Sequence, residues 1–538
     1  MAIYEAAPGA VLPSLDGLPQ VAAVSGPEVQ TLTAEYFDTP DFRLLRAGVT
    51  LRRRHGGEDE GWHLKLPSSA SKGTGPIARR ELRLPLTQPG DPVPAELAYL
   101  VTAHTRQAAL RPVARIETRR HRTTLHDSSG ASLAEIVADE VAAQSLGTST
   151  AVSRWGEVEV ELTGGGRKLR HAAGKRLRDA GLHPAAPSTE LERALPVSPP
   201  APRTDASLTA ASTAGDVVRG YLAAQTARLV SLDPAVRQDE PDAIHQMRVT
   251  TRRLRSALQA YRLIVAADAT QHVRDELKRF GRVLGEARDS EVLSEYLQAM
   301  LASTPTELVM GPAQARIRAH FAPREAAGRA AVLQALDSPA YLAMLDELEA
   351  LLDDPPLTSQ APRPAGQTLP GAVERSYRRV RRRMRRALRT PAGPARDAAL
   401  HEARKAAKRA RYAAEAAGPA SGKGTRRLVK QMKAVQSVLG DHQDAVNARS
   451  AARELGVRAN LAGESSFSFG LLYERAHQDA LRQQHRARRV WKRTLAALGQ
   501  QGGVAGEVQG PSGVVGDAIG HGLPSRAVPV DIAVLQLH

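Results

Sequence analysis

Two segments of the chain place a histidine and several basic residues at the same spacing. In each, basic side chains follow the histidine after three, seven, eight and ten positions. In a helix the histidine and the residues at +3, +7 and +10 fall within an arc of roughly 80°. Such a stripe repels itself unless an anion lies along it. The candidate anion ligands are His245, Arg248, Arg252, Arg253 and Arg255 in the first segment, and His401, Arg404, Lys408, Arg409 and Arg411 in the second.

One such stripe alone could be a solvated basic face, and each histidine could simply pack against a neighbouring helix. Recurrence favours a functional stripe, because a second shared segment follows each one. Lys278 precedes a Leu-Gly pair and then Asp289, and Lys433 precedes the same pattern before Asp444. The motifs recur about 155 residues apart. This predicts two repeated helical bundles within one all-α domain.

The remaining sequence beyond residue 210 is rich in Ala and Leu with a 3.6-residue period, which predicts helices. Pro241 and Pro394 would open the two His/Arg helices, where a proline loses no hydrogen bond. A further arginine-rich helix adds Arg378 and Arg382 to the anion ligands. The predicted helices are 214–229, 241–264, 273–284, 288–301, 311–335, 340–352, 371–388, 394–417, 425–439, 442–454 and 467–498.

Charge is distributed unevenly along the 538 residues, which carry a formal net charge of +17. Residues 1–200 hold 24 basic and 23 acidic residues, and the rest hold 50 and 34. A field of this kind attracts polyanions such as nucleic acid, anionic membrane or inorganic phosphate chains. The chain has no cysteine, which excludes disulfides and thiolate metal sites. With no leader-like segment and no run of 18 apolar residues, we expect a soluble, cytoplasmic protein.

Residues 1–200 read mostly as β-strands separated by turn residues, which predicts a closed or strongly curved antiparallel barrel. Charged residues alternate with apolar ones, so they could lie outside in water or line the barrel. Inside, basic residues would hold phosphate and the acidic row would hold a divalent metal. Three same-face glutamates repel one another unless cations intervene, which favours the lined interior. The predicted strands are 30–37, 48–54, 61–66, 77–86, 113–125, 132–141 and 156–162, with helices at 96–105 and 168–179.

Four motifs in residues 1–195 resemble the CYTH, or triphosphate tunnel, domain: Tyr36-Phe-Asp-Thr-Pro40, Leu51-Arg-Arg-Arg54, His63-Leu-Lys-Leu-Pro67 and Glu157-Val-Glu-Val-Glu-Leu162. The resemblance implies an eight-stranded antiparallel barrel that binds triphosphate with Mg²⁺ or Mn²⁺ and that hydrolyses it in many members. It implies triphosphate ligands at Arg52, Arg54, Lys65, Arg80, Arg115 and Arg119, and metal ligands at Glu157, Glu159, Glu161 and Asp139.

The chain departs from that family at its first strand. The family's signature there is Glu-x-Glu-x-Lys, whereas alignment on Tyr4 puts Ile3 at the lysine and Met1 at the second glutamate. Losing ligands on one side of a metal site weakens its Lewis-acid role. The first strand would be truncated or the start misassigned, so we expect a poor triphosphatase.

Residues 210–500, with their doubled His-x-x-Arg and Leu-Gly-x-x-x-Asp motifs, resemble the CHAD domain. Members of that family bind inorganic polyphosphate, and several associate with polyphosphate granules. The chain is thus expected to be an α+β multidomain protein, an N-terminal antiparallel β-barrel followed by an all-α domain of two repeated helical bundles. The expected divisions are a CYTH-like domain at 1–195, a linker at 196–208, a CHAD-like domain at 209–500 with repeats at 209–352 and 371–498, and a disordered tail at 501–538.

The function expected from these features is binding of inorganic polyphosphate at granules, with an impaired CYTH module. One alternative is a metal-dependent tri- or polyphosphatase to which the helical domain delivers substrate. The other is RNA binding, which is less favoured because single-strand binders stack bases on aromatic residues. Membrane attachment is not expected, because no large apolar face backs the stripes. The aromatic residues near the basic helices are Tyr221, Tyr261, Tyr377 and Tyr412.

Overall fold

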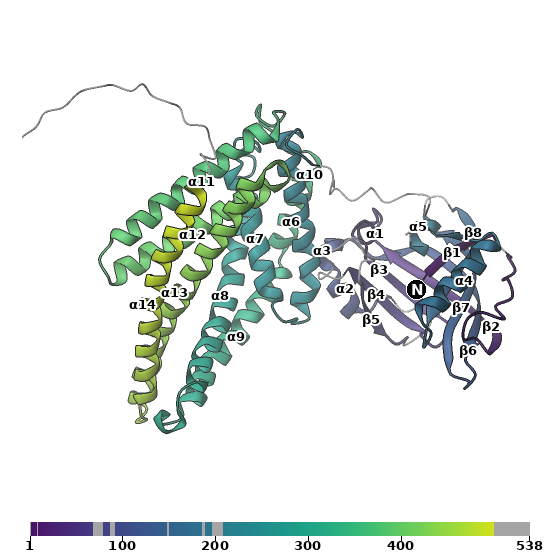
Figure 1. Cartoon of the computed structure of the whole chain (residues 1–538), viewed down its shortest axis with the longest axis horizontal. Helices are drawn as coiled ribbons and strands as arrows, with labels where there is room; N and C mark the ends of the chain where they lie inside the picture. Colours follow the sequence, from purple (N-terminus) through teal and green to yellow (C-terminus); the bar gives the residue numbers. More distant parts are fainter. Residues whose placement is uncertain are drawn as a thin grey trace, which may run out of the picture.

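A computed structural model describes residues 2–7, 9–67, 79–86, 92–147, 150–185, 189–195 and 208–499. The chain forms a β-sheet part, residues 2–195, and a helical part, residues 208–499, which lie side by side (Figure 1). The expected disordered tail at 501–538 and residues 196–207 of the expected linker lie outside the described residues.

One antiparallel sheet makes up most of the N-terminal part, with strand order β5-β4-β3-β2-β6-β7-β8-β1-β9. Within the described residues the sheet stays open, so the predicted barrel is wrong. Closure needs the two edge strands to pair. The edge strand β9 has only two residues, and both pair with β1. On the other edge strand, β5, Arg80 forms an ion pair with Glu240 of the helical part. The strands are β1 (Ala2–Ala6), β2 (Ala23–Asp38), β3 (Thr50–His55), β4 (Gly61–Pro67), β5 (Arg79–Leu84), β6 (Arg111–His126), β7 (Ser132–Ser145), β8 (Val152–Leu162) and β9 (His183–Pro184).

The two faces of the sheet differ because strand side chains alternate between them. One face is apolar at its two ends: helix α4 (Arg167–Asp179) packs against one end, and α2 (Ala95–Leu100) and α3 (Thr102–Thr105) lie at the other. The opposite face carries most of the strand charges. The short helix α5 (Glu190–Ala194) covers its apolar end, and Leu191 and Ala194 pack on Tyr36 and Trp155 there.

The helical part follows the predicted order, with two corrections. Predicted helices 273–284 and 288–301 are one helix, as are 425–439 and 442–454, and Pro241 lies two residues before its helix begins. Its helices are α6 (Ala214–Arg237), α7 (Ala243–Ala260), α8 (Gln271–Ala302), α9 (Ala313–Leu336), α10 (Pro339–Asp353), α11 (Ala365–Arg389), α12 (Pro394–Ala416), α13 (Lys423–Leu461) and α14 (Phe467–Gly499).

A single apolar core joins α6 to α14, and a second, smaller core forms where the far ends of α8, α9, α13 and α14 meet. The sheet part is anchored to this core through α3, whose Ala103 is fully buried in it. Around that contact the guanidinium of Arg237 stacks on Tyr99 at 4.2 Å, and Arg106 lies 3.2 Å from Asp346. The two parts are therefore docked by packing as well as by ion pairs.

Among the residues that the structure describes, no helix is long and apolar enough to cross a membrane.

Candidate functional site

The two His/Arg helices, α7 and α12, lie side by side and turn their basic stripes toward each other. Arg248, Arg252, Arg404 and Lys408 meet there, and we call these four residues the central cluster. All three arginines act electrostatically on Lys408, and Arg248 and Arg404 also act on Arg252. The structure therefore brings together the cores of both predicted stripes.

Each stripe rests on a glycine of the neighbouring helix. A Cβ added at Gly285 of α8 would lie 3.2 Å from Nη2 of Arg248, and one added at Gly440 of α13 would lie 3.1 Å from Nη2 of Arg404. The guanidinium groups thus lie flat against bare helix backbone. The helices predicted to break at each Leu-Gly pair are continuous there, and the glycine leaves space for an arginine side chain.

The aspartate of each Leu-Gly-x-x-x-Asp motif faces the central cluster. Nη1 of Arg248 donates a hydrogen bond to Oδ1 of Asp289 at 2.7 Å. Asp444 is half-buried near Arg404 and Lys408, and its burial raises its pKa above the usual range. Within the described residues, the Arg248–Asp289 contact is the sole ion pair that the central cluster makes.

Burial and the excess of positive charge at the central cluster lower the pKa values of several basic groups there. Burial, followed by Arg404, Arg252 and Arg248, lowers the pKa of Lys408 to about 6. Burial also lowers the pKa values of His245 and His401. An amine whose pKa is lowered by burial and by three nearby guanidinium groups is typical of a site that binds an anion.

The outer members of the stripes have two different roles. Glu415 bridges the helices, accepting hydrogen bonds from Arg253 Nε at 3.1 Å and from Arg411 Nε at 2.6 Å. Both guanidinium groups also stack on Tyr412, so this pair ties α7 to α12. Arg255 and Arg409 continue the positive charge beyond the cluster. Lys278 and Lys433 are exposed, two turns before Gly285 and Gly440 on the same helix faces.

A buried polar network, absent from the sequence prediction, fixes the first turn of α12. Oδ1 of Asp397 contacts Nε2 of His442 at 3.1 Å and accepts a hydrogen bond from Gln484, while Arg449 donates to its other oxygen. These partners lie on α13 and α14. The network therefore sets the position of the stripe that begins at His401, one turn later.

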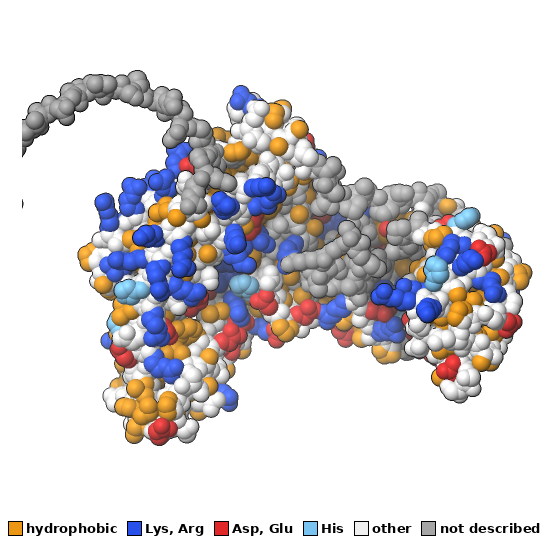
Figure 2. Space-filling model, viewed as in Figure 1, with side chains coloured by type: hydrophobic (Ala, Val, Ile, Leu, Met, Phe, Trp, Pro, Cys, Tyr) orange, Lys and Arg blue, Asp and Glu red, His pale blue; other side chains and the backbone are white. Residues whose placement is uncertain are grey.

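Beside the central cluster, α11 carries nine arginines and a single carboxylate, Glu374. Most of these arginines are exposed, including the predicted ligands Arg378 and Arg382. Arg378 lies 3.6 Å from Glu374. Figure 2 shows Lys and Arg side chains gathered over the side of the helical part where α11 lies, with few acidic side chains among them.

The charged face of the sheet collects several predicted ligands, but their charges are already paired. Arg52 donates a hydrogen bond to the Tyr36 hydroxyl at 3.0 Å and lies 3.5 Å from Glu190 of α5, while Tyr36 donates to the same Glu190 at 2.7 Å. Arg54 lies 2.6 Å from Asp59, and Lys65 lies 3.6 Å from Glu81. Burial and the adjacent Arg52 lower the pKa of Arg54.

The predicted metal ligands share this face without forming a metal site. Arg120 binds both oxygens of Asp139, at 2.9 and 2.6 Å, and Arg193 of α5 lies 3.5 Å from Glu157. Ile3 pairs across the strands with Glu159, where the expected lysine would stand. No group of three or more acidic or histidine side chains in the described part of the chain could hold a metal ion. The residues as placed do not fit Mg²⁺ or Mn²⁺.

Three predicted triphosphate ligands lie away from this face. Arg115 and Arg119 are exposed on the other side of β6, and Arg80 pairs with Glu240 of the helical part. The arginines of β6 that do face the site are Arg120 and Arg122, one and three residues beyond Arg119, because alternate residues share a face. Glu190 and Arg193 of α5 also contact this face, and no strand pattern in the sequence could reveal them.

Comparison with known proteins agrees with this division of the chain. Residues 14–186 match the CYTH domain family, and residues 220–453 match the CHAD domain family. Two uncharacterized proteins of Mycobacterium tuberculosis, from strains CDC 1551 and H37Rv, are each 38% identical over 478 residues, which is 86% of this chain and 90% of theirs.

Two solved structures are similar to about half of the chain. PptA from Streptomyces chartreusis is 20% identical and covers 52% of this chain and all of its own, with a TM-score of 0.45. The CHAD domain of the plant Ricinus communis is 26% identical and covers 56% of this chain and 96% of its own, with a TM-score of 0.43. The matched domains and the extended similarity to the mycobacterial proteins together show that the chain belongs to the family in which a CYTH domain is followed by a CHAD domain.

Proposed function

We propose that this protein binds inorganic polyphosphate at the central cluster and along the arginines of α11. The observation that supports the proposal most directly is the meeting of Arg248, Arg252, Arg404 and Lys408 from two helices against one ion-paired carboxylate, Asp289. Charge-assisted bonds from guanidinium groups to phosphate oxygens are strong and often bidentate. A phosphate chain laid between α7 and α12 would supply the missing negative charge.

The surroundings of the central cluster favour a phosphate chain over RNA. Single-stranded nucleic acid is usually held by bases stacked on exposed aromatic rings. Here Tyr261, Tyr377 and Tyr412 are buried, and the hydroxyl of Tyr221 is buried too. Polyphosphate has no bases and needs only a dense array of cations, which is what these helices offer.

The same packing supports the proposal that the helical part is built from two repeats. The Arg248–Gly285 and Arg404–Gly440 contacts agree within about 0.1 Å, and each lies on the first of two long helices after its stripe. The domain limits at 1–195 and 209–500, and a cytoplasmic location at polyphosphate granules, stay predictions.

A titration with long-chain polyphosphate tests the main proposal. Reversing two cluster charges in an Arg248→Glu/Arg404→Glu variant should weaken binding by at least about 100-fold, because each reversal removes a charge-assisted bond and adds repulsion. The matched control, Arg318→Glu/Arg453→Glu, makes the same charge change at exposed positions of α9 and α13 that lie outside the cluster. Equal loss in both variants, or easy displacement of polyphosphate by RNA, would contradict the proposal.

Triphosphate binding on the sheet is a second candidate, favoured by the shared face of Arg52, Arg54 and Lys65. Because each of these cations already has a carboxylate within 3.6 Å, we expect weak affinity. With no fitting metal site, we also expect little Mg²⁺-dependent hydrolysis by the purified chain. Rapid release of phosphate from triphosphate would instead favour an active hydrolase.

A further inference from the structure

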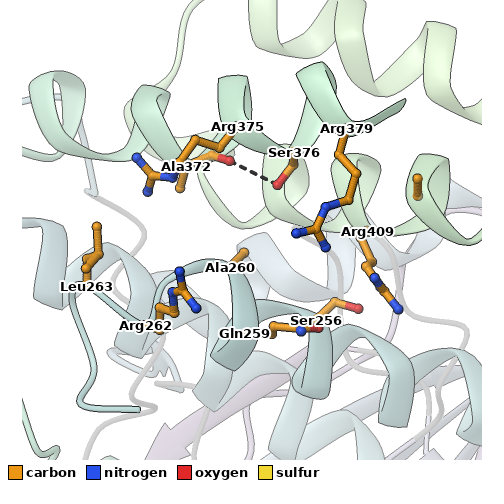
Figure 3. A pocket seen from close by; sticks show the side chains of 11 residues that line it. Ser256, Gln259, Ala260, Arg262, Leu263, Ala372, Arg375, Ser376, Arg379 and Arg409 are labelled. Atoms are coloured by element: carbon orange, nitrogen blue, oxygen red, sulfur yellow. Dashed lines mark hydrogen bonds between the residues drawn. The ribbon is translucent and has the colours of Figure 1, made fainter. Parts of the chain in front are cut away.

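A small basic pocket lies at the end of α7, between that helix, α11 and α12 (Figure 3). Its volume is about 170 Å³. Arg379 points from α11 toward α7, Arg262 points from the end of α7 toward α11, and Arg409 of α12 lies beside Arg379. The other polar residues that line it are Arg375, Ser256, Gln259 and Ser376.

The pocket has no internal counter-charge. None of its four arginines forms an ion pair with a carboxylate of the described residues, in contrast to Arg378 on the same helix. Burial and the neighbouring Arg379 lower the pKa of Arg409, which is the sign of crowded positive charge. Ser376 donates its hydroxyl proton to the carbonyl of Ala372 at 3.0 Å, while Ser256 and Gln259 add neutral hydrogen-bonding groups to the α7 wall.

Size and charge limit what this pocket can hold. Pockets for drug-sized ligands span roughly 300–1,000 Å³, so this one suits a compact group. An internal phosphate of a chain carries one negative charge, whereas a terminal phosphate resembles a phosphomonoester and gains a second charge with a pKa of about 6. Four unpaired arginines favour the group with the greater charge.

Positive charge runs without a break from the central cluster to the pocket. Arg255 follows Arg252 by about one turn on α7, and it neighbours Arg409 of the pocket wall. The distance along α7 from Arg248 to Gln259 is about 16 Å at 1.5 Å per residue. A chain that lies in the cluster can therefore extend toward the pocket along one helix.

We propose that this pocket binds a doubly charged terminal phosphate group, either the end of a polyphosphate chain or free pyrophosphate. The chain-end form of the proposal rests on the proposed function, because it assumes that the rest of the chain lies in the central cluster. Recognition of an end would give the protein a fixed starting point on its ligand, so that affinity per molecule would depend on chain ends as well as on length.

The test uses the full-length protein and short polyphosphate with free ends or with both ends blocked as phosphoramidates. The wild type should bind free-ended chains at least about tenfold more tightly, the effect of one or more charge-assisted bonds. An Arg262→Ala/Arg379→Ala variant should lose that preference and bind both chains alike. The control, Arg318→Ala/Arg453→Ala, removes the same charge elsewhere and should keep it. An equal loss of affinity for free and blocked chains in the pocket variant would overturn the chain-end assignment.

A calorimetric titration with pyrophosphate separates this proposal from the proposed function. If long polyphosphate fails to bind but pyrophosphate binds and the pocket variant loses it, the proposed function fails and the pocket stands. If long polyphosphate binds while pyrophosphate fails and the pocket variant behaves as wild type with both chains, the pocket proposal fails alone. Circular dichroism of both variants checks that each is folded.

Discussion

The charged face of the sheet and the basic surface of the helical part use the same residue types in opposite electrostatic states. On the sheet, Arg52, Arg54 and Arg120 each lie within 3.5 Å of a carboxylate. On the helices, Arg252, Arg404 and Lys408 have no ion pair in the described part of the chain, and α11 sets nine arginines against one glutamate. The sheet is neutralised from within, whereas the helices are left short of negative charge.

This difference shows that basic residues alone do not indicate an anion site. Whether each one is already paired with a carboxylate of the protein matters more. Helix α5 adds one partner of each sign to this face, since its Glu190 lies 3.5 Å from Arg52 and its Arg193 lies 3.5 Å from Glu157. An incoming triphosphate or cation must displace those contacts first. At the central cluster an anion displaces at most the Arg248–Asp289 pair.

The largest expected effect is the salt dependence of polyphosphate binding to the helical part. Binding of a single-stranded polyanion falls with log salt by roughly 0.7 per phosphate contact, so six contacts lose about two to three powers of ten between 50 and 200 mM salt. We expect this for polyphosphate in a series of titrations at increasing KCl concentration. An Arg252→Gln/Arg404→Gln variant should flatten the slope by roughly 1.4. A slope near zero in the wild type would place the ligand away from the exposed cations.

Most of the fold could be predicted from periodicity, but the faces of the sheet could not. Seven strands and nearly all helices fall where alternation or the 3.6-residue pattern places them. In β6 the arginines at 119, 120 and 122 stand at both odd and even positions, which point to opposite faces of a strand. The pattern alone therefore could not say which of them lie on the charged face. A shift of one residue moves each side chain to the opposite face. The pairing of Arg120 with Asp139 settles the matter.

The placing of each basic stripe on one helix face could be predicted because its geometry is local. A stripe at +3, +7 and +10 is fixed by one helix, and the structure needs only to bring two such helices together. The sequence could not show that Glu415 draws Arg253 and Arg411 into a structural contact. Barrel closure likewise depends on distant edge strands, and β9 is too short to give a sequence signal.

Removing the charge of Glu190 should leave a cation of the sheet without a carboxylate partner, as in the helical part. In a Glu190→Gln variant, Arg52 loses its carboxylate partner, so triphosphate affinity should rise by roughly tenfold. Isothermal titration with triphosphate measures the change. The control, Glu117→Gln, removes an exposed carboxylate from the other face of β6 and should change little. If both variants gain equally, net charge rather than local pairing controls the sheet.

Proton uptake should accompany polyphosphate binding at the central cluster. Burial and the three arginines lower the pKa of Lys408 to about 6, so without a bound anion the amine is mostly neutral at pH 7. A bound anion stabilises its protonated form and raises that pKa. Affinity should therefore increase as pH falls from about 9 toward 6, by up to about tenfold per unit, and level off below. Calorimetry in buffers of different ionisation enthalpy counts the protons.

A Lys408→Met variant provides the control for this pH effect. It should bind polyphosphate more weakly at pH 6 and show a flatter profile, while any remaining dependence would come from His245 and His401. These histidines act in the same direction, because burial lowers their pKa values and a bound anion favours their charged forms. An unchanged proton count in the variant would exclude Lys408 as the coupled group.

The smallest expected effect tests whether the glycines position the cluster. In a Gly285→Ala variant the new Cβ would lie 3.2 Å from Nη2 of Arg248, so the guanidinium must move and polyphosphate affinity should fall about threefold. The same change in a helix interior favours folding by about 1 kcal/mol. Gly281→Ala is the matched control, since its Cβ would make an ordinary 3.5 Å contact with Thr251. Denaturant unfolding should therefore show both variants as stable as the wild type or more so, and only Gly285→Ala should bind polyphosphate less well. Weaker binding in both would mean that polyphosphate affinity depends on helix packing in general, and not on the contact of Arg248 with Gly285.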